Sequence, residues 1–159
     1  MNYWLFKTEP SDFSIQDLEG RPNKREGWDG VRNYQARNFM RDDARIGDLV
    51  LLYHSSCKIV GVAGLAKVSQ INIPDPTQFD PNSKYYDGTS TENEPRWWMV
   101  EIEHVETFDE ILSLKTIKTL PQINDLPLVK KGNRLSIMPV QKPEFDVILS
   151  AANAKFLAN

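Results

Sequence analysis

The sequence predicts an α+β fold in which a small mixed β-barrel carries short helices at its ends. Strand-like segments are scattered among short helical ones, which disfavours a doubly wound parallel sheet. Gly61 and Gly64 lie inside one apolar strand, as expected at a sharp bend of a barrel. The length of 159 residues fits one domain, and we assign residues 1–159 to it.

The first elements are a strand and a short helix. Residues 3–6 predict the strand, which Pro10 would end. Ser14, followed three residues later by Asp17, predicts the capped start of a helix of one or two turns. The glycines and proline that follow predict a loop leading to Trp28.

A basic amphipathic helix and two strands come next. Residues 34–45 predict the helix, because apolar side chains recur at i, i+3, i+4 and i+8 from Ala36. Residues 48–53 are almost continuously apolar and predict a strand buried on both faces. Residues 58–68 predict a second strand, which a hairpin joins to the first.

The second half of the chain contains one long irregular segment. Residues 74–91 are rich in Pro, Asp, Asn and Ser, and such loops often carry function. Beyond it we expect a strand over 96–106, a short helix over 113–120, a strand over 135–140 and a helix from Pro143 onward.

Composition bears on location and partners. Cys57 is the only cysteine, which is typical of a reducing compartment. Lys7 and Glu9 interrupt the first apolar residues, unlike a signal peptide, and no apolar run approaches the roughly 20 residues that span a bilayer. We therefore expect a cytoplasmic monomer that is neither secreted nor bound to membranes.

The charge pattern limits the kind of nucleic-acid contact. A net charge of −3 argues against binding through bulk electrostatics. Two basic clusters occur, at Arg32, Arg37, Arg41 and Arg45 and at Lys130, Lys131 and Arg134. Solvated surface is their ordinary explanation, but local phosphate contacts beside a pocket fit them as well.

Trp28 is the leading candidate for a ligand contact. A large ring in a loop, between Gly27 and Gly30, is either a partly exposed core anchor or a platform for a flat polar ring. Stacking a nucleobase on such a platform is worth roughly 1–3 kcal/mol. A second ring could come from Phe79, Tyr85, Tyr86 or Trp97.

Polar residues near Trp28 offer further contacts. Arg32 could hold a base or a phosphate, and Asn33 could pair with a base edge, although Asn33 equally fits a helix N-cap. The polar run 7–11 fits either a turn or the rim of a pocket.

The run His54-Ser55-Ser56-Cys57 invites a catalytic interpretation. Because neighbours on a strand face opposite ways, His54 and Ser55 would not meet as base and nucleophile. No nucleophile-elbow motif is present either, so hydrogen bonding to a ligand or loop is favoured. One cysteine and two histidines without metal-binding spacing predict no metal, and dinucleotide and phosphate-loop fingerprints are absent, so we expect no cofactor.

Taken in order, these motifs resemble the EVE domain, a member of the PUA-like superfamily related to the YTH and ASCH domains. The resemblance rests on residues 3–11, 28–33, 47–48, 53–56, 61–64, 84–87 and 98–102. It implies a PUA-like pseudo-barrel of about five or six strands with short flanking helices. It also implies a non-enzymatic module that recognises a modified nucleobase, for example a methylated one, in DNA or RNA.

The aromatic cage of the related YTH domains suggests which residues make the contacts. Base contacts are expected from Trp28, Val31, Arg32, Asn33, Tyr53, His54, Ser55, Phe79, Tyr85 and Tyr86. Phosphate contacts are expected from Lys7, Arg37 and Arg41.

Two alternatives stay open. One is an enzyme that acts on a nucleotide or nucleic acid through His54 and one carboxylate among Asp29, Glu9 and Asp87. The other is an unselective RNA-binding module, whose affinity would fall steeply with salt and ignore base modification.

Overall fold

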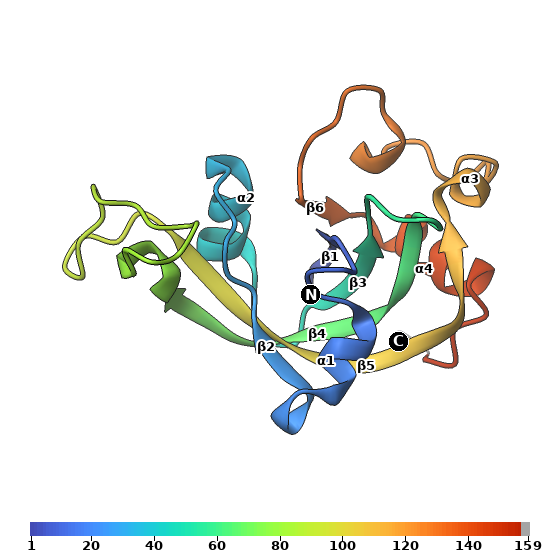
Figure 1. Cartoon of the computed structure of the whole chain (residues 1–159). Coiled ribbons are helices and arrows are strands. Elements are labelled where there is room, and N and C mark those ends of the chain that lie inside the picture. The colour runs from blue at the N-terminus through green and yellow to red at the C-terminus, as the bar shows by residue number, and fades with distance from the viewer. Residues whose placement is uncertain (157–159) are drawn as a thin grey trace.

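The computed structural model describes residues 1–156, in which six strands form one mixed sheet (Figure 1). The strands are β1 (Tyr3–Thr8), β2 (Arg25–Gly27), β3 (Leu49–His54), β4 (Gly61–Pro74), β5 (Trp98–Ser113) and β6 (Ile137–Val140). They lie in the order β2-β5-β4-β3-β1-β6, so the sheet has two edges and is not closed. The α+β class and the mixed sheet agree with the sequence prediction. Instead of a closed barrel, the chain forms an open sheet with the long strands β4 and β5 curving through it (Figure 1).

The two faces of the sheet bury different apolar cores. The helices are α1 (Ile15–Gly20), α2 (Tyr34–Asn38), α3 (Leu114–Ile117) and α4 (Lys142–Ala151). Side chains alternate along a strand, so Leu5 of β1 joins the core with Phe145 of α4, whereas Phe6 joins the core with Ile15 of α1 and Trp28. Every residue of β3 is buried, which confirms the prediction for this strand.

The helix expected over 34–45 is shorter and less regular. α2 ends at Asn38, and a π-helical turn continues over Phe39–Asp43. The backbone N–H of Ala44 donates to the carbonyl of Phe39 over 2.9 Å, and this wider turn places the Phe39 ring 5.5 Å from that of Trp4. The predicted capping box of α1, between Ser14 and Asp17, is confirmed.

Pairing between strands explains the other differences from the sequence prediction. Residues 25–27 were expected in a loop but form β2 by pairing with residues 101–103 of β5. β4 and β5 extend beyond the predicted limits because they pair with each other from Gly61–Ser113 to Pro74–Trp98. Within residues 1–156, no helix combines the length and apolar composition needed to cross a membrane.

Candidate functional site

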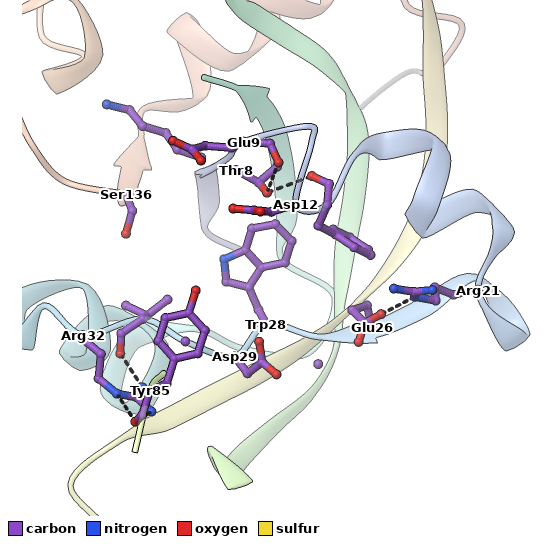
Figure 2. A pocket seen from close by; sticks show the side chains of 15 residues that line it. Thr8, Glu9, Asp12, Arg21, Glu26, Trp28, Asp29, Arg32, Tyr85 and Ser136 are labelled. Atoms are coloured by element: carbon purple, nitrogen blue, oxygen red, sulfur yellow. Dashed lines mark hydrogen bonds and ion pairs between the residues drawn. The ribbon is translucent and has the colours of Figure 1, made fainter. Parts of the chain in front are cut away.

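A cavity of about 470 Å³ opens beside Trp28 (Figure 2). Segments distant in sequence form its walls: the end of β1 and the turn after it, residues 26–32, the loop that contains Tyr85, and Ser136. Ser136 arrives through the pairing of β1 with β6, since the backbone N–H of Lys7 donates to the Ser136 carbonyl over 2.8 Å. Arg21, at the end of α1, lines the cavity as well, so the fold gathers one concave site from five parts of the chain.

Trp28 is fixed at the centre of this cavity. Its backbone N–H donates to the carbonyl of Val100 in β5 over 2.8 Å, and its ring lies 5.5 Å from that of Phe6 and 5.9 Å from that of Phe13. The side chain is only 8% exposed, yet its indole N–H has no partner among the described residues. Figure 2 shows this N–H directed toward the side where Tyr85 and Ser136 lie. Trp28 thus combines a rigid apolar ring with an unused hydrogen-bond donor.

Tyr85 supplies a second aromatic ring, and Gly30 makes room for it. Gly30 has φ +80°, and a Cβ at this position would lie 2.7 Å from two atoms of the Tyr85 ring. Only glycine meets both conditions without strain. The Tyr85 ring also lies 5.5 Å from the Arg32 guanidinium and 5.1 Å from the Lys84 ammonium.

Arg32 holds the Tyr85 loop in place. A guanidinium has five N–H groups, and this one donates to the carbonyls of Val31 and Tyr85, the Asp75 carboxylate and the Thr77 hydroxyl in five hydrogen bonds of 2.7–3.1 Å. Asp75 is only 1% exposed and also accepts from the backbone N–H of Gly30 over 2.8 Å. All donors of Arg32 are therefore engaged within the protein.

The remaining polar groups of the cavity include negatively and positively charged side chains. The carboxylates of Glu9, Asp12 and Asp29 have no hydrogen-bond partner on another described residue, whereas Glu26 is paired with Arg21. Crowding by protein, together with the carboxylates of Asp75 and Glu26, raises the pKa of Asp29, although the residue keeps contact with solvent.

Lys7 also lines the cavity, and partial burial lowers the pKa of its ammonium. The cavity therefore offers free acceptors and free donors around an aromatic ring. Among residues 1–156, no three His, Cys, Asp or Glu side chains are grouped to hold a metal ion.

The chain matches the family model of the EVE domain over residues 2–151. It belongs to the EVE domain family. Thymocyte nuclear protein 1 of Homo sapiens is 39% identical over 166 residues, covering 94% of this chain and 73% of the relative. The rat protein of that name is 39% identical over 171 residues, covering 97% and 75%.

Solved structures place this EVE domain in the same group. The crystal structure of human THYN1 in complex with DNA containing 5-methylcytosine has a TM-score of 0.87, with 38% identity over 98% of this chain and 99% of the other. A protein of Pseudomonas syringae gives 0.89, with 45% identity over 94% and 99%. An ASCH protein of Zymomonas mobilis, at 9% identity, gives 0.52 over 94% and 98% and shares the fold alone. The EVE resemblance and the PUA-like fold are thereby confirmed.

Five of the contact residues expected from the sequence line the cavity of the EVE domain: Lys7, Trp28, Val31, Arg32 and Tyr85. The polar run after β1 also reaches it, through Thr8 and Glu9. The geometry brings these residues together and leaves their roles toward a ligand as predictions.

Several other expected base contacts are engaged elsewhere. The Asn33 side chain caps α2 by accepting from the N–H of Ala36 over 3.0 Å, the alternative role noted above. His54 is 4% exposed, and its Nε2 accepts from the N–H of Ile15 at the start of α1. Tyr53 is buried in the core shared with α4.

The rest lie outside the cavity lining. The Ser55 backbone N–H donates to the carbonyl of Thr8 over 2.9 Å. Phe79 ends a 3-10 turn, and Tyr86 is half-exposed in the same loop. Of the expected phosphate contacts, Arg37 lies over the Tyr34 ring, and Arg41 pairs with Asp42 at 2.8 Å.

Sequence reasoning did not name every lining residue. Asp12, Phe13, Glu26 and Ser136 enter the cavity through strand pairing and the turn after β1, and no local motif marks them. Gly30 had a visible signal, because a glycine two residues after a loop tryptophan suggests close packing.

Proposed function

We propose that this EVE domain binds a single nucleobase of a DNA or RNA strand in the Trp28 cavity, without catalysis, and prefers a base with a small modification. The observation that carries the proposal is the fixed indole with an unpaired N–H in a concave site of about 470 Å³. Cavities of roughly 300–1,000 Å³ suit small planar ligands. The complex of human THYN1 with DNA containing 5-methylcytosine supports the same ligand class.

Stacking on Trp28 supplies the main affinity in this proposal. Base–aromatic stacking contributes roughly 1–3 kcal/mol. One added methyl group contributes roughly 0.8 kcal/mol, about a fourfold preference. Extruding a paired base costs a few kcal/mol, so the isolated domain would favour single strands over duplexes.

Asp29 is our candidate for reading the base edge. Carboxylates accept hydrogen bonds from the exocyclic amino group of cytosine, and the Asp29 carboxylate lines the cavity without a hydrogen bond to any other described residue. Thymine has a carbonyl oxygen in place of this amino group. That oxygen would face the Asp29 carboxylate, and two hydrogen-bond acceptors would then oppose each other. The site would therefore favour 5-methylcytosine over thymine.

A binding role is favoured over an enzymatic one because His54, the base of the enzymatic alternative, is buried and already accepts a backbone N–H. The single cysteine supports action inside the cell, and we propose that a monomer suffices, since the cavity is formed within one chain.

Fluorescence anisotropy of labelled single strands tests the proposal. Strands of one sequence would carry 5-methylcytosine, cytosine or thymine at a central position. We expect Trp28→Ala to weaken binding of the 5-methylcytosine strand about 5- to 150-fold, the equivalent of the stacking term. Trp98→Ala is the matched control, because Trp98 lies on β5 and does not line the cavity.

Thermal unfolding of each variant separates affinity from stability, because Trp28 also packs on Phe6 and Phe13. Equal affinity of the parent protein and a folded Trp28→Ala variant would refute the proposal.

A further inference from the structure

Tyr34 carries an exposed aromatic ring that is not part of the cavity lining. Tyr34 is the first residue of α2 and is 51% exposed. Its ring lies 4.8 Å from the ring of Trp97 at an interplanar angle of 17°, which is a stacked arrangement. An exposed tyrosine held parallel to a buried tryptophan presents a flat, oriented surface.

Trp97 is itself held rigidly. It is 6% exposed, its indole N–H donates to the Asp87 carboxylate over 2.8 Å, and its backbone N–H donates to Oε1 of Gln78 over 3.0 Å. Because Trp97 is fixed from both side chain and backbone, the Tyr34 ring needs little reordering to accept a partner.

Arg32 connects this stack with the cavity wall. Its guanidinium carbon lies 5.0 Å from the Trp97 ring and 5.5 Å from the Tyr85 ring. Tyr85 lines the cavity. A continuous series of planar groups thus runs from the cavity through Tyr85, Arg32 and Trp97 to the exposed Tyr34.

Arg37 adds unused positive charge at the exposed end. Its guanidinium carbon lies 4.6 Å from the Tyr34 ring. Three of its five N–H groups donate, to the Asn38 side chain and to the carbonyl of Arg96. The other two have no partner among the described residues. Neighbouring Arg41, in contrast, is paired with Asp42.

We propose that Tyr34 and Arg37 form a second nucleic-acid contact, in which a base next to the one in the cavity stacks on Tyr34 while Arg37 holds the intervening phosphate. This inference rests on the function proposed above. Aromatic rings and arginine planes are the usual partners of unpaired bases. The occupant is a single strand, because a base must be unstacked from its neighbour to lie on Tyr34.

The test compares ligands with and without flanking nucleotides. Affinities would be measured for the free nucleoside 5-methyl-2′-deoxycytidine and for single strands in which nucleotides are added on its 5′ or 3′ side. In the parent protein, flanks on one side should raise affinity about 5- to 150-fold, the range that corresponds to stacking one base. Tyr34→Ala should abolish this gain and leave nucleoside affinity unchanged, whereas Tyr34→Phe should keep both.

Ile59→Ala is the control, since Ile59 is a similarly exposed large side chain, 53%, that lies between β3 and β4 and does not line the cavity. Arg37→Gln should reduce the gain in affinity from the flanking nucleotides, although the Tyr34 ring is still present. The inference is overturned if Tyr34→Ala retains the full gain, or if it weakens nucleoside and strand equally. Failure of the proposed function is distinct, because strand binding would then be insensitive to Trp28→Ala.

Discussion

Two of the aromatic rings that line the cavity, those of Trp28 and Tyr85, depend on different neighbours. Trp28 is fixed by apolar packing against Phe6 and Phe13 and by its backbone bond to β5. Tyr85 is fixed by the absence of a side chain at Gly30 and by the hydrogen bonds of Arg32 to its carbonyl. A change at Gly30, which also lines the cavity, therefore alters the site by moving Tyr85.

Gly30→Ala should weaken base binding by displacing Tyr85. The new Cβ would lie 2.7 Å from the Tyr85 ring, closer than carbon atoms approach, so the ring must move. Loss of one stacking surface predicts an affinity loss of about 5-fold or more for a single strand that carries 5-methylcytosine. Anisotropy titration measures this loss.

Gly132→Ala is the control for backbone strain. Gly132 has φ +79°, against +80° at Gly30, but a Cβ there meets nothing within 4 Å. Both variants should lose about 1–2 kcal/mol of stability from the left-handed backbone, and only Gly30→Ala should lose affinity. Equal affinities of the two variants would show that Tyr85 does not contribute to binding.

Trp28 and Arg32 illustrate how far a residue's role can be predicted from sequence. Trp28 and Arg32 were recognised as neighbours of a site because they share one short motif. The sequence could not show that all donors of Arg32 are used by Asp75, Thr77 and Tyr85, since these residues follow it by more than 40 positions.

The hydrogen bond between α1 and the end of β3 should make the stability of the protein depend on pH. The neutral imidazole of His54 accepts the N–H of Ile15, the first residue of α1, over 3.1 Å. Burial lowers the pKa of His54 below its ordinary value of 6.5, and the nearby Asp17 opposes this shift. A protonated His54 could not accept this hydrogen bond, because both ring nitrogens would then be donors.

Stability should therefore fall when the medium becomes acidic. Because the folded pKa is lowered, the unfolded chain binds the proton more readily, and unfolding is favoured as pH falls below about 6.5 toward the folded pKa. Above pH 6.5 the contribution is fully present. For one proton the slope cannot exceed about 1.4 kcal/mol per pH unit. Urea unfolding between pH 5 and pH 8 measures it.

His54→Gln gives the comparison for this pH effect. Glutamine keeps an acceptor oxygen but does not titrate, so the variant should lose part of the pH slope and keep its fold. His104, whose pKa burial also lowers, stays in both proteins and contributes to the residual slope. Identical slopes in the two proteins would exclude His54 as the group responsible.

Local signals predicted the elements whose own residues carry a strong pattern. The capping box of α1 and the continuous apolar run of β3 identified those elements from a few residues each. β2 has three residues and exists only through pairing with β5, so no local pattern could reveal it. Ser136 reaches the cavity for the same reason, through the pairing of β6 with β1.

The charge of the entire protein sets how binding should respond to salt. The chain has 19 basic and 22 acidic side chains, and four carboxylates line the cavity. Recognition would therefore depend on the ring and the base edge, with few phosphate contacts. An unselective RNA-binding module, the alternative drawn from the sequence, would instead need many.

A shallow salt dependence is the resulting prediction. Each phosphate contact to a single strand contributes about −0.7 to the slope of log affinity against log salt. With Lys7, Arg37 and Arg41 as the expected phosphate contacts, the slope should be no steeper than about −2. Anisotropy titrations at salt concentrations from about 50 mM to about 500 mM measure this slope.

Two variants serve as comparisons. Arg37→Gln should make the slope shallower by about 0.7, whereas Lys115→Gln on α3, which lies far from α2 (Figure 1), should leave it unchanged. A slope near −5 together with equal affinity for methylated and plain strands would favour the unselective module, because counterion release would then outweigh the contribution of the cavity.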